Sequence, residues 1–146
     1  DTMRMESGFL HWGHDISPEE NQYQAGLNFA VSFKKDVNFI GKESLLKIKD
    51  KKQSRRLVML SLKDSKPGDP LLLHDEPIYL ENKIIGRTTS GNYSFNYNKN
   101  LSFGYIKTVL TNDELLKKNL FLEVEKKKYA VVLETKPLKD KSIRFS

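Results

Sequence analysis

From residue 55 onward the chain is a series of short apolar segments, each separated from the next by a turn. "LFLEV", for example, alternates Leu120, Leu122 and Val124 with other residues, and the run that follows it predicts a terminal hairpin. A second hairpin is expected with its turn at Glu81 and Asn82, and a strand is expected after "KPGDP". Short strands at such close spacing predict an antiparallel Greek-key β-barrel or sandwich.

The first fifty residues have a different character. We expect the end of a helix over residues 1–8, a half-buried strand in "AGLNFAVSF", and a short helix from Lys42 to about Asp50. The carboxylates Glu19 and Glu20 follow Pro18, as in the first turn of a helix. The charged run "DKKQSRR" then suggests a boundary. The expected fold is mainly β with minor α, divided into residues 1–50, a short α+β segment, and residues 55–146, the barrel.

Composition excludes several kinds of protein. The 146 residues include no Cys, which rules out disulfides, thiolate nucleophiles and Cys-based zinc sites. Neither a membrane-length apolar run nor a signal peptide is visible, so we expect a cytoplasmic protein without membrane partners. The net charge of +6 comes mostly from scattered Lys without interleaved aromatic residues. This pattern favours a solvated basic surface. The alternative is a stand-alone basic β-barrel module that binds nucleic acid.

The stretch from Arg4 to Phe29 holds the densest chemistry of the chain, including the single Trp and two of the three His. His11, His14 and Asp15 lie close together in sequence, but a mononuclear metal site needs a further strong ligand, and no metal site is expected. A nucleophile elbow is also missing from the sequence. Taken alone, these residues predict a β-rich domain with a polar, aromatic loop near its start.

Two longer motifs carry a family resemblance. "DTMRMESGFLHWGHDISPEENQYQAGLNFAV", followed by "FIGKESL", resembles the folate-binding T-protein family. "EPIYLENKIIGRTTSGNYSFNYNKNLSFGYI" is similar to the C-terminal barrel signature of the same family. The Trp-Gly-His-Asp run is closer to the dimethylglycine and sarcosine dehydrogenase branch than to the glycine-cleavage aminomethyltransferase. The resemblance covers nearly the whole chain.

The resemblance implies a one-carbon enzyme. Family members transfer a methylene group from an amine (derived from glycine, dimethylglycine or sarcosine) to tetrahydrofolate, in a pocket ringed by three domains. Residues 1–50 match the end of the folate-binding domain, and residues 55–146 match the C-terminal barrel. The implied partners are the upstream domains, one of which would bind FAD in the dehydrogenase branch, and a small-molecule amine. The family's catalytic carboxylate lies upstream, so we expect no catalytic residue in this chain and no activity from it alone.

Three residues are candidates for facing the folate pocket. Phe29 matches an aromatic position of the family, and the resemblance implies a flat ring there that can pack against the folate; the alternative is an inward-facing strand residue. Trp12 would shape the loop together with Asp15. Arg144 lies near a C-terminal family residue that reaches the substrate, and the alternative is a free terminal side chain. If the pocket is shared with other domains, Trp12 and Phe29 should contribute to an exposed apolar patch on the single chain.

Overall fold

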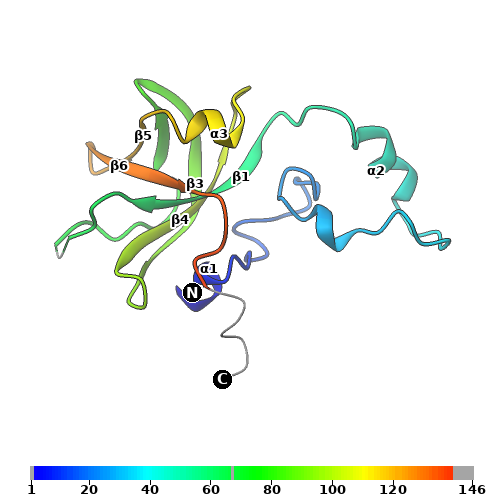
Figure 1. Ribbon diagram of the computed structural model, residues 1–146, viewed down its shortest axis with the longest axis horizontal. Helices are drawn as coiled ribbons and strands as arrows, with labels where there is room; N and C mark the ends of the chain where they lie inside the picture. Colours follow the sequence, from blue (N-terminus) through cyan, green and yellow to red (C-terminus); the bar gives the residue numbers. More distant parts are fainter. Residues whose placement is uncertain (1, 67, 140–146) are drawn as a thin grey trace.

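Six antiparallel strands form a closed barrel in the computed structural model, which describes residues 2–66 and 68–139 (Figure 1). Around the barrel the strands follow the order β1-β4-β3-β2-β5-β6, and the pairing of β1 with β6 closes it. Their bounds are β1 Arg56–Leu62, β2 Pro77–Leu80, β3 Lys83–Ser94, β4 Lys99–Ile106, β5 Leu120–Val124 and β6 Lys127–Glu134. Because β1 lies beside β4, the first four strands form a Greek key, as expected from the sequence.

Both predicted hairpins are present. Leu80 pairs with Lys83, so Glu81 and Asn82 form the turn between β2 and β3. Val124 pairs with Lys127 across the second turn, where Glu125 and Lys126 both have positive φ. Two consecutive residues of this kind match the right-handed twist of the strands that they join.

The core has two parts on opposite faces of the sheet. The alternation of β1 sends Val58, Leu60 and Leu62 into the barrel and Met59 to its outer face. Among the described residues, eighteen hydrophobic side chains are buried, and most of them fill the barrel. Outside it, Met59 packs with Met5, Leu101 and Phe103 in a second cluster that holds the first helix against the barrel.

The connection from β1 to β2 is irregular, and the strand expected after "KPGDP" is not formed. Leu72 is nevertheless fully buried, because its backbone presses against β3 at Gly91. A Cβ atom at Gly91 would lie 2.4 Å from the carbonyl carbon of Leu72, so only glycine fits there. The segment therefore packs Leu72 into the barrel core and contributes no strand.

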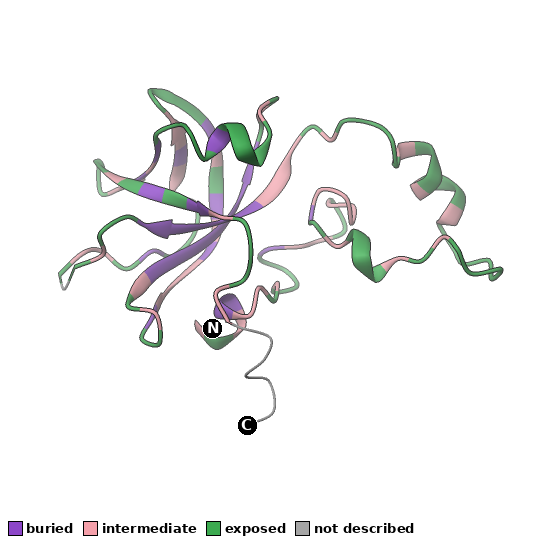
Figure 2. Cartoon of the chain, viewed as in Figure 1, coloured by how far each residue is buried: buried purple, intermediate pink, exposed green. Residues whose placement is uncertain are grey.

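Helix α1, Thr2–Glu6, packs on β3 and β4, as its buried residues Met5 and Glu6 require. The prediction of a strand in "AGLNFAVSF" was wrong. Asn28–Ala30 instead form a short 3-10 helix, η1, with no buried residue. Alternation alone cannot make a strand where no sheet edge is free, and the closed barrel offers none. Helix α2, Lys42–Ile48, is present as expected, but it projects away from the barrel and buries no residue (Figures 1 and 2).

Helix α3, Asn112–Leu115, begins with a capping box. Thr111 accepts a hydrogen bond from the backbone N–H of Glu114, whose carboxylate in turn accepts from the Thr111 backbone. This reciprocal arrangement satisfies two backbone donors at the helix start. Among residues 2–66 and 68–139, none of the helices has the length and apolar character to cross a bilayer.

Candidate functional site

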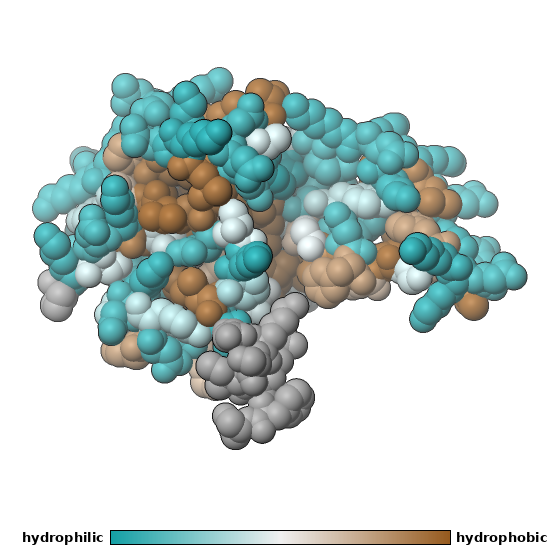
Figure 3. Space-filling view, viewed as in Figure 1, coloured by the Kyte–Doolittle hydropathy of each residue, from teal (hydrophilic) through white to brown (hydrophobic). Residues whose placement is uncertain are grey.

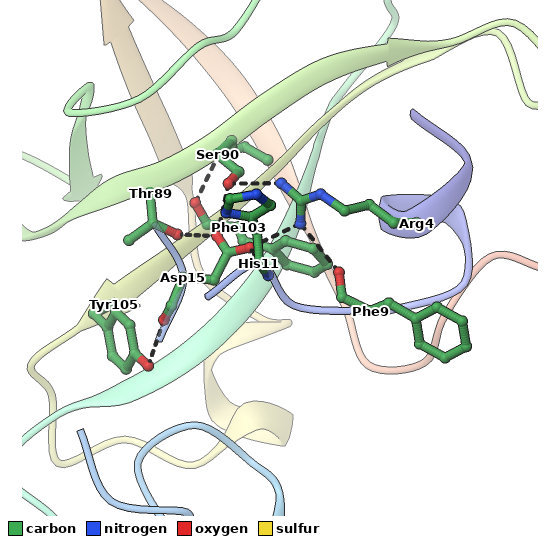
Figure 4. A network of polar contacts seen from close by, with 9 residues as sticks. Arg4, Phe9, His11, Asp15, Thr89, Ser90, Phe103 and Tyr105 are labelled. Carbon is green, nitrogen blue, oxygen red and sulfur yellow. Dashed lines mark hydrogen bonds and ion pairs between the residues drawn. The ribbon is translucent and has the colours of Figure 1, made fainter. Parts of the chain in front are cut away.

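The buried carboxylate of Asp15 fastens the loop after α1 to strand β3 (Figure 4). Its Oδ2 accepts hydrogen bonds from the Arg4 guanidinium at 2.8 Å and from the His11 backbone at 2.9 Å. Its Oδ1 accepts from the hydroxyls of Thr89 at 2.6 Å and Ser90 at 2.8 Å. A buried carboxylate is tolerated only when its lone pairs are filled in this way. Asp15 therefore acts as the anchor that fixes this loop on the barrel.

Tyr105 of β4 completes the anchor from the opposite side. Its hydroxyl donates to the backbone oxygen of Asp15 at 2.9 Å, and the Arg55 guanidinium lies 5.0 Å from its ring centre. Burial, with a smaller contribution from the Glu20 carboxylate, raises the pKa of Tyr105 to about 12, against the opposing effect of Arg55. The phenol is thus a permanent hydrogen-bond donor at ordinary pH.

Glu6 makes a second buried connection between α1 and the barrel. Its carboxylate accepts from the Ser94 hydroxyl at 2.5 Å and from the Asn96 amide at 2.9 Å. Two residues apart on a helix, Arg4 and Glu6 do not face each other. Arg4 donates to Asp15 and to Ser90 of β3, whereas Glu6 accepts from Ser94 and Asn96.

Glu19 and Glu20 are not in the first turn of a helix, which corrects the sequence-based interpretation. Residues 18 and 19 lie in a turn, and Glu20 folds back to accept from the backbone and hydroxyl of Ser17. Glu20 also pairs with Arg55, immediately before β1. The Ser17–Glu20 spacing is that of a capping box, which explains why it resembled a helix start.

An apolar groove runs between this anchored segment and the outer face of the barrel. Its volume is about 530 Å³, and its walls include Leu27 and Phe29 on one side and Leu57, Met59 and Phe103 on the other. Phe29 is 86% exposed, so its ring lies open on the groove. In the space-filling view, apolar side chains are visible between the barrel and the projecting segment (Figure 3). An exposed patch of this kind marks a surface that contacts a ligand or another protein part.

The three residues predicted to face a pocket have different outcomes. Phe29 lines the groove. Trp12 is 65% exposed and forms a single β-bridge with Ile16, but it does not line the groove. Arg144 lies outside the described residues. The expected exposure of both Trp12 and Phe29 on the single chain is thus met, although the structure does not bring the two rings to one hollow.

The sequence did not lead us to the residues of β1 and β4 that line the groove. Leu57, Met59 and Phe103 line it because they point outward from β1 and β4. The alternation of "RLVMLSL" contained this signal, since one of the two faces of an apolar strand had to lie outside the barrel.

The groove offers little acid–base chemistry of its own. Glu134 is the one carboxylate among its described walls, and it already accepts from the Ser61 hydroxyl at 2.6 Å and from Lys99 at 3.1 Å. Lys136 is the one cation there. Within residues 2–66 and 68–139 no group of three His, Asp or Glu could hold a metal ion. The arrangement suits the packing of a flat apolar group and lacks a free general base.

A larger hollow, of about 890 Å³, lies between residues 13–20 and strands β2 to β4. Several of its charged groups are already paired, as in Arg55 with Glu20 and Arg87 with Asp75. It lacks the exposed aromatic ring that the groove presents, so the groove is the better candidate.

Comparison with known proteins gives a consistent picture. The family "Glycine cleavage T-protein C-terminal barrel domain" matches residues 55–140. A 4-methylaminobutanoate oxidase (formaldehyde-forming) of Paenarthrobacter nicotinovorans is 43% identical over 93 residues, which are 64% of this chain and 11% of that protein. The mitochondrial dimethylglycine dehydrogenase of Homo sapiens is 35% identical over 136 residues, 93% of this chain and 15% of that protein.

Shorter relatives match as well. An aminomethyltransferase of Listeria welshimeri is 39% identical over 108 residues, 74% of this chain and 29% of that protein. The crystal structure of the glycine cleavage system aminomethyltransferase T from Bartonella henselae superimposes with a TM-score of 0.79 at 24% identity, covering 95% of this chain and 37% of that chain. That likeness shows a shared fold. The present chain thus spans less than a third of the length of these curated relatives.

Proposed function

We propose, since this chain belongs to the glycine cleavage T-protein C-terminal barrel domain family, that its apolar groove is one wall of a folate pocket. The remainder of that pocket would come from other domains of a one-carbon enzyme. The sequence resemblance to aminomethyltransferases and dimethylglycine dehydrogenase supports this reading.

One observation carries the proposal. The Phe29 ring is 86% exposed on a groove whose walls are largely apolar. Leaving a phenylalanine in water forgoes about 2 kcal/mol of burial free energy. A covering partner or ligand would recover that energy, and in this proposal other domains and the folate provide that cover.

The groove fits part of a folate and not all of it. The face of Phe29, with Leu27 and Met59 beside it, suits stacking and packing against a flat ring system. The pterin edge also needs hydrogen-bond partners, and the carboxylate of Glu134 is already occupied. Tetrahydrofolate, when bound, would supply the acceptor for the one-carbon unit, while this chain would orient one face of it.

The catalytic step belongs elsewhere in this proposal. A general acid–base reaction requires a positioned carboxylate, and the described walls of the groove offer none that is free. We therefore place the catalytic groups, the site for the amine and any FAD-binding domain in other parts of a longer enzyme located in the cytoplasm. Residues 1–50 would be the end of the folate-binding domain, and residues 55–146 its C-terminal barrel.

A pair of assays tests the proposal. The 146-residue chain is incubated with tetrahydrofolate and an aminomethyl donor, and methylene transfer is compared with the product of the complete reading frame that contains it. Transfer by the longer product alone is expected. Turnover by the chain alone, above the uncatalysed reaction, would show that the chemistry has been misplaced.

The alternative, a basic nucleic-acid module, makes a different prediction. Nucleic-acid binding depends on phosphate contacts and falls steeply as salt rises. Contacts to an apolar groove are much less sensitive to salt. Tight, salt-sensitive binding of single-stranded DNA to the chain would favour the alternative over the folate pocket.

A further inference from the structure

A third hollow lies on a different part of the barrel, between the end of α3 and strand β6. Its volume is about 280 Å³. Leu116, Phe121 and Val132 contribute to its apolar floor, and Lys63, Lys117 and Lys118 stand at its rim. It shares no residue with the groove that Phe29 lines. Whatever it binds is therefore independent of the proposed folate wall.

The floor of this hollow is exposed for a definite reason. In β6, Val131 and Leu133 point into the barrel, so the residue between them, Val132, must point outward and is 38% exposed. Leu116 follows α3, whose Leu115 is buried in the barrel end, and is itself 51% exposed. Figure 3 shows apolar side chains gathered between α3 and β6 with hydrophilic ones around them.

The positive charge of the three rim lysines is offset only in part by the rest of the chain. Within the described ranges none of the three ammonium groups forms an ion pair or a hydrogen bond, and the lining includes no acidic side chain. Glu114 attracts Lys117 but is engaged in the Thr111 capping box, whose hydrogen bonds are the main reason that its pKa is lowered.

The carboxylate of Glu81 accepts a hydrogen bond from the backbone N–H of Asn119, which also lines the hollow. The hollow thus combines a few exposed apolar side chains with three ammonium groups that make no direct ion pair among the described residues. Like charges held close together are unfavourable, and an anion placed among them relieves the repulsion.

We propose that this hollow binds an amphiphilic carboxylate, a molecule with a short alkyl chain or a single ring and one carboxylate group. The apolar part would cover Leu116, Phe121 and Val132, and the carboxylate would lie among the three lysines. An apolar floor is the wrong surface for a nucleic-acid backbone, which needs charge along its whole length. The volume lies just below the range typical of drug-sized ligands, which favours a small molecule.

Nuclear magnetic resonance titration of the 146-residue chain with sodium octanoate tests the proposal. We expect saturable shifts of the Leu116, Lys118 and Val132 amide signals. Octylammonium, which has the same chain and the opposite charge, should leave them unchanged. The double variant K117E/K118E should bind octanoate at least tenfold more weakly.

The matched control is K126E/K127E, which changes the net charge equally at the turn of the β5–β6 hairpin. It should bind octanoate as the parent chain does. V132S, which removes part of the floor and leaves the lysines, should also weaken binding. Three results would each overturn the proposal: no saturable shift with octanoate, shifts confined to other residues, or equal loss of affinity in the two double variants.

Discussion

Arg4 and Asp15 form an ion pair of 2.8 Å that joins helix α1 to the loop after it, and the Asp15 side chain is fully buried. We predict that D15A lowers the free energy of unfolding by about 3 kcal/mol, because it removes the buried carboxylate that accepts from Arg4, Thr89 and Ser90. Urea denaturation followed by circular dichroism measures this.

The control for that variant is D75A. Asp75 pairs with Arg87, but both side chains are largely exposed, so its loss should cost no more than about 1 kcal/mol. Equal destabilisation by the two substitutions would show that Asp15 is not the anchor of this segment.

Tyr105 should make stability depend on pH at the alkaline end. Its pKa is raised to about 12 in the folded chain, whereas an unfolded tyrosine ionises near 10. The unfolded state therefore releases its proton first, and the contribution of Tyr105 is fully present below pH ~10 and lost as pH rises toward ~12.

The variant Y105F tests this linkage. Y105F should abolish the loss of folding stability that the ionisation of Tyr105 causes at alkaline pH. It should also lower the free energy of unfolding at neutral pH by about 1 kcal/mol, because the Asp15 backbone oxygen loses a donor. Urea melts of both proteins between pH 8 and pH 11.5 make the comparison. If the parent chain and Y105F lose stability in parallel over this range, Tyr105 is not the source of the alkaline loss.

Some of this arrangement was accessible from the sequence and some was not. The Glu81-Asn82 turn and the alternation of β5 are local signals, and each predicted its element correctly. The Asp15 anchor depends on hydroxyls of Thr89 and Ser90, more than seventy residues away, so no local pattern announces it.

The prediction of a strand around Phe29 was wrong for a related reason, because strand formation depends on contacts with distant parts of the chain. Its alternation is real, but a strand requires a neighbour with free backbone groups, and the barrel closes on itself. Phe29 nevertheless lines the candidate groove, and the family motif had selected it by position and not by secondary structure. Its contact with folate stays a prediction.

Limited proteolysis should cut first between Asp50 and Ser54. This stretch joins α2 to β1, contains no helix or strand and has no buried residue. Trypsin is expected to act after Lys51 or Lys52, because an exposed loop can enter the protease without local unfolding. If the first cuts fall in the β5–β6 turn, at Lys126 or Lys127, the boundary between the two domains does not lie at residues 50–54.

The two products of that cut should stay together under native conditions. Arg4, Glu6 and Asp15 bind the first fragment to β3 of the second through several hydrogen bonds. Size-exclusion chromatography of the nicked chain should therefore give one peak, and D15A should split it more readily than D75A. Immediate separation of the nicked parent chain would disagree with the anchor.

Trp12 reports directly on the open loop. As the single tryptophan, with a ring that is 65% exposed, it should emit at long wavelength and be quenched strongly by acrylamide. The same experiment on the complete reading frame, if further tryptophans are first replaced by phenylalanine, should show weaker quenching where another domain covers the loop. Weak quenching in the short chain would mean that Trp12 is already enclosed.

The most direct test of the folate wall is the effect of F29A on the product of the complete reading frame. Phe29 would stack on the folate, so F29A should raise the KM for tetrahydrofolate by roughly tenfold, equivalent to about 1.4 kcal/mol of lost packing. F29Y, which keeps a flat ring, should stay near the parent value.

F95A is the matched control, since Phe95 is 79% exposed, close to the value of Phe29, but lies just beyond β3 and does not line the groove. The account predicts a raised KM for F29A alone, with F29Y and F95A close to the parent enzyme. An unchanged KM in F29A, or the same rise in F95A, would contradict the claim that this groove forms a wall of the folate pocket.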